Sequence, residues 1–210
     1  MVMLMNILNS RLYSILEVLS FFFLLNTLWF LMCLPIITIF PATAAMFAVI
    51  RQWVMKKDSA IFIPFFRFFK ENFLQSFVIG IIFFVFTSIL YIDFKLVHTF
   101  NPKLHIFLFA SLYLLGLIGT FTLVYVFPMM VHYRLTLWRV IKNSFFFSIR
   151  YVLSTVLCVL ILLAMVYLLF NLPVLFLVIF SFVAYLIFII CYSRFRKEEA
   201  LAAEQNKENE

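Results

Sequence analysis

Residues 34–46 read LPIITIFPATAAM and stand where a long apolar run gives way to basic sequence. Pro35 lies near the end of that run and is expected to kink a helix, because proline removes a backbone hydrogen bond and leaves a carbonyl for a nearby hydroxyl or amide. Pro41 suits the first turn of a second helix, where a missing N–H costs nothing. Three alanines follow and allow close helix approach. We therefore expect an elbow between a membrane span and a second helix.

The same stretch contains Ala42-Thr43-Ala44, a small-x-small pattern that also occurs at signal-peptide cleavage sites. The apolar run before it is longer than the 7–15 residues of a signal peptide, and no basic cluster precedes it. Cleavage would also leave the following basic segment outside the cell, against the usual distribution of charge. The sequence therefore favours retention of the stretch.

The composition places the chain in the membrane. Of its 210 residues, 67% are hydrophobic, whereas a soluble domain is near half apolar. The apolar residues come in continuous blocks, which is typical of spans in lipid. A net charge of +7 would suggest nucleic acid in a soluble protein, but in a membrane chain it reports topology. We expect the lipid bilayer as a partner and no nucleic acid.

Five apolar blocks are long enough to cross about 30 Å of hydrocarbon as helices. They lie at about 18–40, 73–92, 104–130, 151–170 and 172–192. The last two are separated by the Asn171–Pro173 corner, where proline favours a tight hairpin. The predicted fold is an all-α, multi-pass membrane protein with one integral membrane domain over residues 1–195.

Basic residues are distributed unevenly between these blocks. Segments 41–72 and 131–150 and the tail after residue 192 together hold 13 of the 16 lysines and arginines. The positive-inside rule places these segments in the cytoplasm, so that five spans put the N-terminus outside and the C-terminus inside. Residues 196–210 read as a charged, solvated cytoplasmic tail.

The first basic segment also has the pattern of an amphipathic helix. On a helix from Ala42, Met46 and Trp53 share an apolar stripe, while Arg51 falls on another face. Such a helix suits the cytoplasmic headgroups, which we favour, or the surface of a partner protein. Phe40-Pro41 is predicted to close the first span and Phe127-Pro128 the third, and Trp138 then follows in a second basic segment as Trp53 does in the first. The two stretches form either a parallel internal repeat or a chance similarity of two Phe-rich loops.

Ionisable residues are missing from the middle of every predicted span. Ion-coupled transporters and proton relays place such groups there. The sequence also lacks a nucleophile–base pair, a carboxylate pair and any cysteine or histidine pattern with metal-ligand spacing. We expect no catalytic, cofactor or metal site, and no enzymatic activity.

Neutral polar residues do occur inside the spans. Asn26, in the middle of the first span, is expected to find a hydrogen-bond partner on another helix. Gly116, Gly119 and Thr120 make the third span the best candidate for close helix contact, through a small-xxx-small pair at 116 and 120. Such groups hold a helix bundle together, and they also suit the lining of a pore.

Residues 25–54, LNTLWFLMCLPIITIFPATAAMFAVIRQWV, resemble the YesL-like family of bacterial integral membrane proteins. The resemblance rests on Asn26, Trp29, Leu34, Pro35, Thr38, Pro41, Ala42, Thr43, Ala44 and Arg51. Where the family often has glycine before the second proline, this chain has Phe40. The family has no established activity, and its members are often encoded beside carbohydrate-uptake transporters. The resemblance therefore implies an accessory role in the bacterial cytoplasmic membrane.

Taken together, these observations favour a non-enzymatic accessory or regulatory component of a transport system, with carbohydrate uptake as the implied class and transporter subunits as partners. The alternative is a small transporter or channel for an uncharged solute. The sequence leaves the oligomeric state open. The residues expected to carry structure or interaction are Asn26, Trp29, Pro35, Thr38, Pro41, Ala42, Thr43, Arg51, Trp53, Gly116, Thr120, Pro128 and Trp138.

Overall fold

The computed structural model describes residues 2–55, 60–97 and 102–208, and over these residues it is helical, without strands. The α-helices are α1 (Val2–Cys33), α2 (Ile39–Val54), α3 (Phe62–Val97), α4 (Pro102–Tyr133), α5 (Leu137–Arg150), α6 (Val152–Asn171) and α7 (Ile179–Glu208). Two short 3-10 helices, η1 (Ile36–Thr38) and η2 (Pro173–Leu177), join α1 to α2 and α6 to α7. The predicted all-α class is confirmed. Lys56 and Lys57 of the predicted basic segment lie outside the described residues.

Within the described residues, six helical segments are long and apolar enough to cross a membrane. They are Leu16–Cys33, Ile36–Val54, Phe62–Val97, Ile106–Tyr133, Val152–Asn171 and Ile179–Gln205. The expected count of about five is close, and the additional segment is Ile36–Val54. Six crossings would return the chain to its starting side, so the N-out orientation, which was derived from five spans, stays a prediction.

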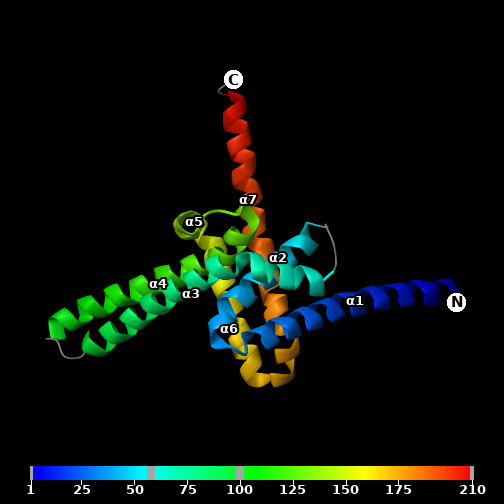
Figure 1. Cartoon of the computed structure of the whole chain (residues 1–210), viewed down its shortest axis with the longest axis horizontal. Coiled ribbons are helices and arrows are strands. Elements are labelled where there is room, and N and C mark those ends of the chain that lie inside the picture. Colours follow the sequence, from blue (N-terminus) through cyan, green and yellow to red (C-terminus); the bar gives the residue numbers. More distant parts are fainter. Residues whose placement is uncertain (1, 56–59, 98–101, 209–210) are drawn as a thin grey trace.

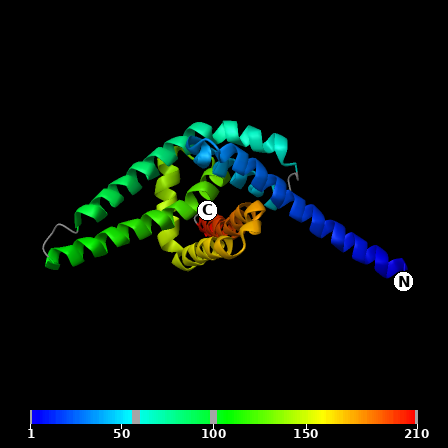
Figure 2. The ribbon, with the colours of Figure 1, turned by 90° about the horizontal axis from the view of Figure 1, so that it is seen from below.

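The helices radiate from one packed centre. In Figure 1, α3 and α4 extend together to the left, α1 extends to the right, and the end of α7 points upward. Figure 2 shows the same α3–α4 hairpin and α1 diverging on opposite sides of the centre. We call the α3–α4 hairpin the arm. The core lies where α2 meets α1, α3, α4 and α7.

Helix α2 is buried on nearly all sides, which corrects the expectation that it lies at the headgroups. Ala44, Ala45 and Ile50 are fully buried, and Trp53 stacks on Phe21 with ring centroids 4.1 Å apart. The small residues at the start of α2 let the neighbouring helices approach closely. The apolar stripe predicted on α2 is therefore only part of its buried surface. The other predicted amphipathic loop helix is present as α5, whose Val140 is buried while Lys142 is exposed.

Helix α4 continues through Pro128 to Tyr133, so the prediction that this proline closes a span is wrong. Residues 124–131 are the most buried part of α4, and packing there outweighs the cost of proline inside a helix. Pro41, by contrast, lies in the first turn of α2. Trp53 is half-buried and packs against the core, whereas Trp138 is 72% exposed. The two Phe-Pro stretches therefore occupy different environments, which argues against a structural repeat.

The charged tail is a helical continuation of α7. Glu198 forms an ion pair with Arg150 (Oε1 to Nε, 2.9 Å) and accepts a hydrogen bond from the Tyr151 hydroxyl. Glu199 Oε1 lies 3.2 Å from His132 Nε2 at the end of α4. The first turn of the predicted solvated tail is thus docked on α4 and α5, while residues 200–205 are exposed.

Candidate functional site

The candidate site is the elbow, residues 34–46, which joins α1 to α2. Pro35 ends α1 instead of kinking it, and the chain forms η1 before α2 begins at Ile39. Thr38 Oγ1 lies 2.5 Å from Met32 O and 2.6 Å from Pro35 O, so its proton is shared between two carbonyls at the helix end. The expectation that a hydroxyl would bond a carbonyl near Pro35 is confirmed. At this point, however, the helix is fully broken and not only kinked. Pro41 lies in the first turn of α2, as predicted.

A second bond closes the elbow as a hairpin. Trp29 Nε1–H donates to Thr43 Oγ1 at 3.1 Å, and that hydroxyl donates to Ile39 O at 2.7 Å. The Trp29 indole also stacks on Phe180 of α7, with ring centroids 4.8 Å apart. Ala42 is fully buried beside this contact. These residues therefore fix α2 against α1 and α7.

Asn26 ties the same region to the last hairpin of the chain. Its side chain is 2% exposed, its Nδ2 donates to Phe176 O at 2.8 Å, and its Oδ1 accepts from Ser181 N–H at 3.3 Å. Ser181 Oγ is in turn 2.8 Å from Phe22 O. The expected interhelical partner of Asn26 is thus the turn of η2 and the start of α7. We call this set of bonds the Asn26 bridge.

The bridge places η1 and η2 at the same end of the molecule. Phe22 contacts Tyr185, whereas Phe30, two turns closer to η1, contacts Phe176 within η2. Helices α1 and α7 are therefore antiparallel. A Leu-Pro pair stands at the start of both 3-10 turns, because η1 follows Leu34-Pro35 and η2 begins at the proline of Leu172-Pro173. Both tips are apolar and exposed, with Ile36 at 82% and Val174 at 79%. This pairing was not predicted from the sequence, although LPII at residues 34–37 and LPVL at residues 172–175 share a pattern that could have suggested it.

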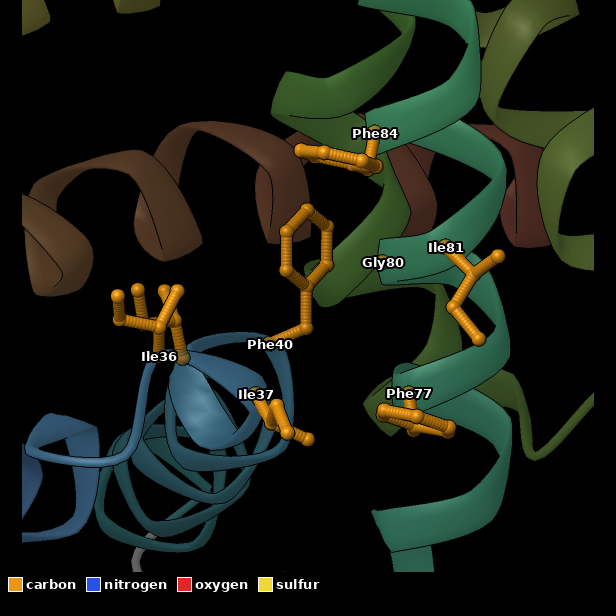
Figure 3. A pocket seen from close by; sticks show the side chains of 8 residues that line it. Ile36, Ile37, Phe40, Phe77, Gly80, Ile81 and Phe84 are labelled. Carbon is orange, nitrogen blue, oxygen red and sulfur yellow. The ribbon is translucent and has the colours of Figure 1, made fainter.

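An apolar pocket of about 440 Å³ opens between the elbow and α3. Figure 3 shows Phe40 from the elbow standing beside Gly80 of α3, with Ile36, Ile37 and Phe84 around it. A Cβ atom added at Gly80 would lie 2.9 Å from Phe40 Cγ, so Phe40 occupies the space that the glycine leaves free. Among the described non-glycine residues, positive φ occurs at Arg134, so Phe40 at the family's glycine position adopts an ordinary backbone conformation.

The close helix contact predicted at Gly116 and Thr120 lies instead on a neighbouring face of α4, at Gly119. A Cβ at Gly119 would lie 2.5 Å from Phe86 of α3, whereas at Gly116 it would lie 4.0 Å from Leu90. Thr120 is exposed and donates to Gly116 O within its own helix (2.9 Å). The close approach inside the arm is therefore at Gly119. Spacing alone identified the correct helix and the wrong face.

The polar groups of the elbow and of the adjoining part of α1 are used in structure. The hydroxyls of Thr38 and Thr43, the indole N–H of Trp29 and the amide of Asn26 all bind main-chain or side-chain partners within the protein. Arg51 stands apart from them, in the last turn of α2. Among the described residues there is no group of three or more His, Cys, Asp or Glu side chains that could hold a metal ion. The geometry is that of a rigid joint with an apolar pocket beside it.

Comparison with known proteins gives a consistent picture. A family model described as "Protein of unknown function, DUF624" matches residues 22–94, which include the elbow and most of α3. In Bacillus subtilis (strain 168), the uncharacterized protein YteU is 33% identical over 152 residues, covering 70% of this chain and 68% of YteU. The uncharacterized protein YesV is 39% identical over 157 residues (71% and 74%), and YesL is 34% identical over 128 residues (59% and 60%). No solved structure matches the chain.

Proposed function

Because the chain belongs to the DUF624 family of proteins of unknown function, which includes YesL-like relatives, we propose that it is a non-enzymatic accessory or regulatory component of a membrane transport system. Carbohydrate uptake is the class of transport that the family resemblance suggests. The bacterial cytoplasmic membrane is the compartment we propose, in line with the bacterial relatives. The partners would be membrane-embedded transporter subunits.

The observation that carries this proposal is the arm. Helix α3 has 36 residues, so it is about 54 Å long, well beyond the roughly 20 residues needed to cross a bilayer. Towards its far end the arm is held by contacts between its own helices, such as Phe94 on Phe109 with ring centroids 4.8 Å apart. Large side chains such as Phe84 and Phe107 are highly exposed. An apolar, aromatic hairpin that leaves the core offers a long surface for the helices of another membrane protein.

The use of the buried polar groups also supports an accessory role over the alternative of a solute channel. A channel for an uncharged solute needs polar groups that face its lumen. Asn26 and Ser181 instead bind one another and the main chain between helices. Thr122 on α4 donates to Ile118 O of its own helix. These side chains stabilise helix contacts, as neutral polar residues commonly do in membrane bundles.

Photocrosslinking from the arm tests the proposal. A photoreactive phenylalanine analogue at Phe107 of the arm is compared with the same analogue at Phe170 of α6, because both side chains are highly exposed. Cells are irradiated, and adducts are purified in mild detergent and identified by mass spectrometry. We expect position 107 to capture a defined transporter subunit and position 170 to capture mainly lipid. Capture of lipid alone at both positions, or capture of the same set of proteins at both positions, would count against an accessory role.

The transport class needs its own measurement. Uptake of a panel of labelled sugars is compared between a strain lacking this gene and the same strain carrying it on a plasmid. We expect reduced uptake of at least one sugar, restored by the plasmid, with the transporter subunits still present in the membrane. Unchanged uptake together with a transporter crosslink would keep the accessory role and replace its substrate class.

A further inference from the structure

A second apolar groove lies between the arm and α5, away from the elbow. Its volume is about 400 Å³, and its lining includes Ile82 and Phe86 of α3, Ile118 and Gly119 of α4, and Trp138 and Lys142 of α5. Most of its wall is apolar. The polar exception on α4, Thr122, is satisfied by its own helix through the bond to Ile118 O (2.8 Å). The groove is therefore apolar, with one charged side chain, Lys142, at its edge.

The groove follows from the packing of three helices. Gly119 has no side chain, and the Phe86 ring fills the space where its Cβ would stand, which brings α3 and α4 together at this point. Helix α5 buries Val140 and Ser144, spaced four residues apart, and turns a different face to the groove. Trp138 and Lys142, also four apart, belong to that face. The amphipathic pattern of α5 thus places Lys142 at the apolar groove.

Lys142 is available for an external anion. It is exposed, and the described residues place no carboxylate within salt-bridge distance of its ammonium group. A lysine stem can lie along apolar surface while its charge reaches the headgroup region. Trp138 at the same groove is 72% exposed, as suits an indole at the boundary between hydrocarbon and headgroups.

We propose that this groove binds one phospholipid with an anionic headgroup, with an acyl chain along the apolar wall and the headgroup phosphate on Lys142. The apolar wall matches an acyl chain, and the lysine without a carboxylate partner complements a negative headgroup. The exposed indole provides a contact for the glycerol region between them. The groove includes the side of the arm that faces α5, and the proposal does not depend on transporter subunits binding elsewhere on the arm.

Lipid retention measured by native mass spectrometry tests the headgroup contact. The purified full-length protein is exchanged into micelles containing equal amounts of phosphatidylglycerol and phosphatidylcholine, and bound lipids are counted. We compare Lys142→Ala with Arg139→Ala, which removes a basic residue of the same helix that does not line the groove. We expect the wild type and Arg139→Ala to retain one phosphatidylglycerol preferentially. Lys142→Ala should weaken that preference about fivefold, as expected for one cation near a lipid surface.

A second pair of variants tests the groove itself. Ile82→Trp places a bulky ring in the groove, whereas Ile89→Trp adds the same ring to an exposed position of α3 outside it. We expect Ile82→Trp to lose the retained lipid and Ile89→Trp to keep it, with similar unfolding temperatures as the check on folding. Equal retention of both lipids by the wild type, unchanged retention in Lys142→Ala and Ile82→Trp, or a protein in place of the lipid would each overturn the proposal.

Discussion

Trp29 of α1 and Thr43 of α2 are joined by a hydrogen bond of 3.1 Å between the indole Nε1–H and the threonine Oγ1. The two residues are 14 positions apart, and the chain between them makes a complete reversal. Because Thr43 also donates to Ile39 O, its hydroxyl serves as donor and acceptor at the start of α2. The bond therefore holds the break after α1 in one geometry.

We expect Thr43→Val to destabilise the protein by about 1 kcal/mol, because valine keeps the shape of threonine and removes the acceptor of the Trp29 N–H. Thr27→Val is the matched control, since Thr27 is bonded within its own helix, to Phe23 O. Stability is measured by reversible unfolding with sodium dodecyl sulfate in mixed micelles. An equal effect of the two substitutions would show that the Trp29 contact contributes nothing to stability.

Asn26→Ala should cost about 1–3 kcal/mol, because it removes two interhelical bonds and leaves the Phe176 carbonyl and the buried Ser181 N–H without their partner. Asn171→Ala provides the control. The Asn171 amide is exposed and bonds to Tyr167 O of the same helix. The same unfolding assay measures both variants. A loss for Asn26→Ala no larger than for Asn171→Ala would contradict the bridging role.

Gly80→Ala is expected to destabilise the protein by about 1–3 kcal/mol, because the new methyl group would lie 2.9 Å from Cγ of Phe40. At Gly116 the nearest atom would be 4.0 Å away, so Gly116→Ala should be neutral or stabilise α4 by up to about 1 kcal/mol through helix propensity. Thermal unfolding in detergent gives the order of the two variants. The reverse order would mean that Phe40 does not pack on Gly80.

The antiparallel contact of α1 and α7 predicts that the tip at η1 faces the side opposite the basic tail. In a background with the three native cysteines replaced by alanine, we expect Ile36→Cys to react with an impermeant maleimide in intact cells. Ala202→Cys on the tail should react only after permeabilisation. Both ends of the chain would then be cytoplasmic. Labelling of Ile36→Cys only after permeabilisation would instead support the five-span topology with an external N-terminus.

Glu198→Gln should release the start of the tail from α5. Glutamine keeps the size of the side chain and removes the charge that pairs with Arg150 at 2.9 Å. A loss of about 1 kcal/mol corresponds to roughly fivefold faster tryptic cleavage after Lys197, since cleavage requires local opening of the helix. The exposed Glu204→Gln is the control. Equal cleavage rates for the two variants would show that the tail is held by other contacts.

The sequence was sufficient for the helical class because the length of an apolar block alone determines whether it can cross a bilayer. It was also sufficient for local chemistry at the elbow. The roles of Pro41 in a first turn and of Thr38 beside a freed carbonyl follow from proline geometry, and both are present in the structure. The corner at Asn171–Pro173 is explained in the same way.

Features that depend on neighbouring helices were not predictable in this way. Helix α2 was read as a surface helix because Arg51 and Trp53 resemble interfacial residues, but its burial is decided by α3, α4 and α7. Pro128 was read as a helix end because its local penalty is large, yet it lies in the most buried part of α4. Gly119 rather than Thr120 makes the close contact because the facing ring, Phe86, belongs to another helix.

The Asn26 bridge has a consequence for how the protein is made. Ser181 follows Asn26 by 155 residues, so at about 5–20 residues per second the ribosome needs on the order of ten to thirty seconds to supply the second half of the bridge. During that time the first hairpin is already in the membrane without its final neighbour. The position of the elbow is therefore settled only after α7 has been made, when that helix is joined to α1.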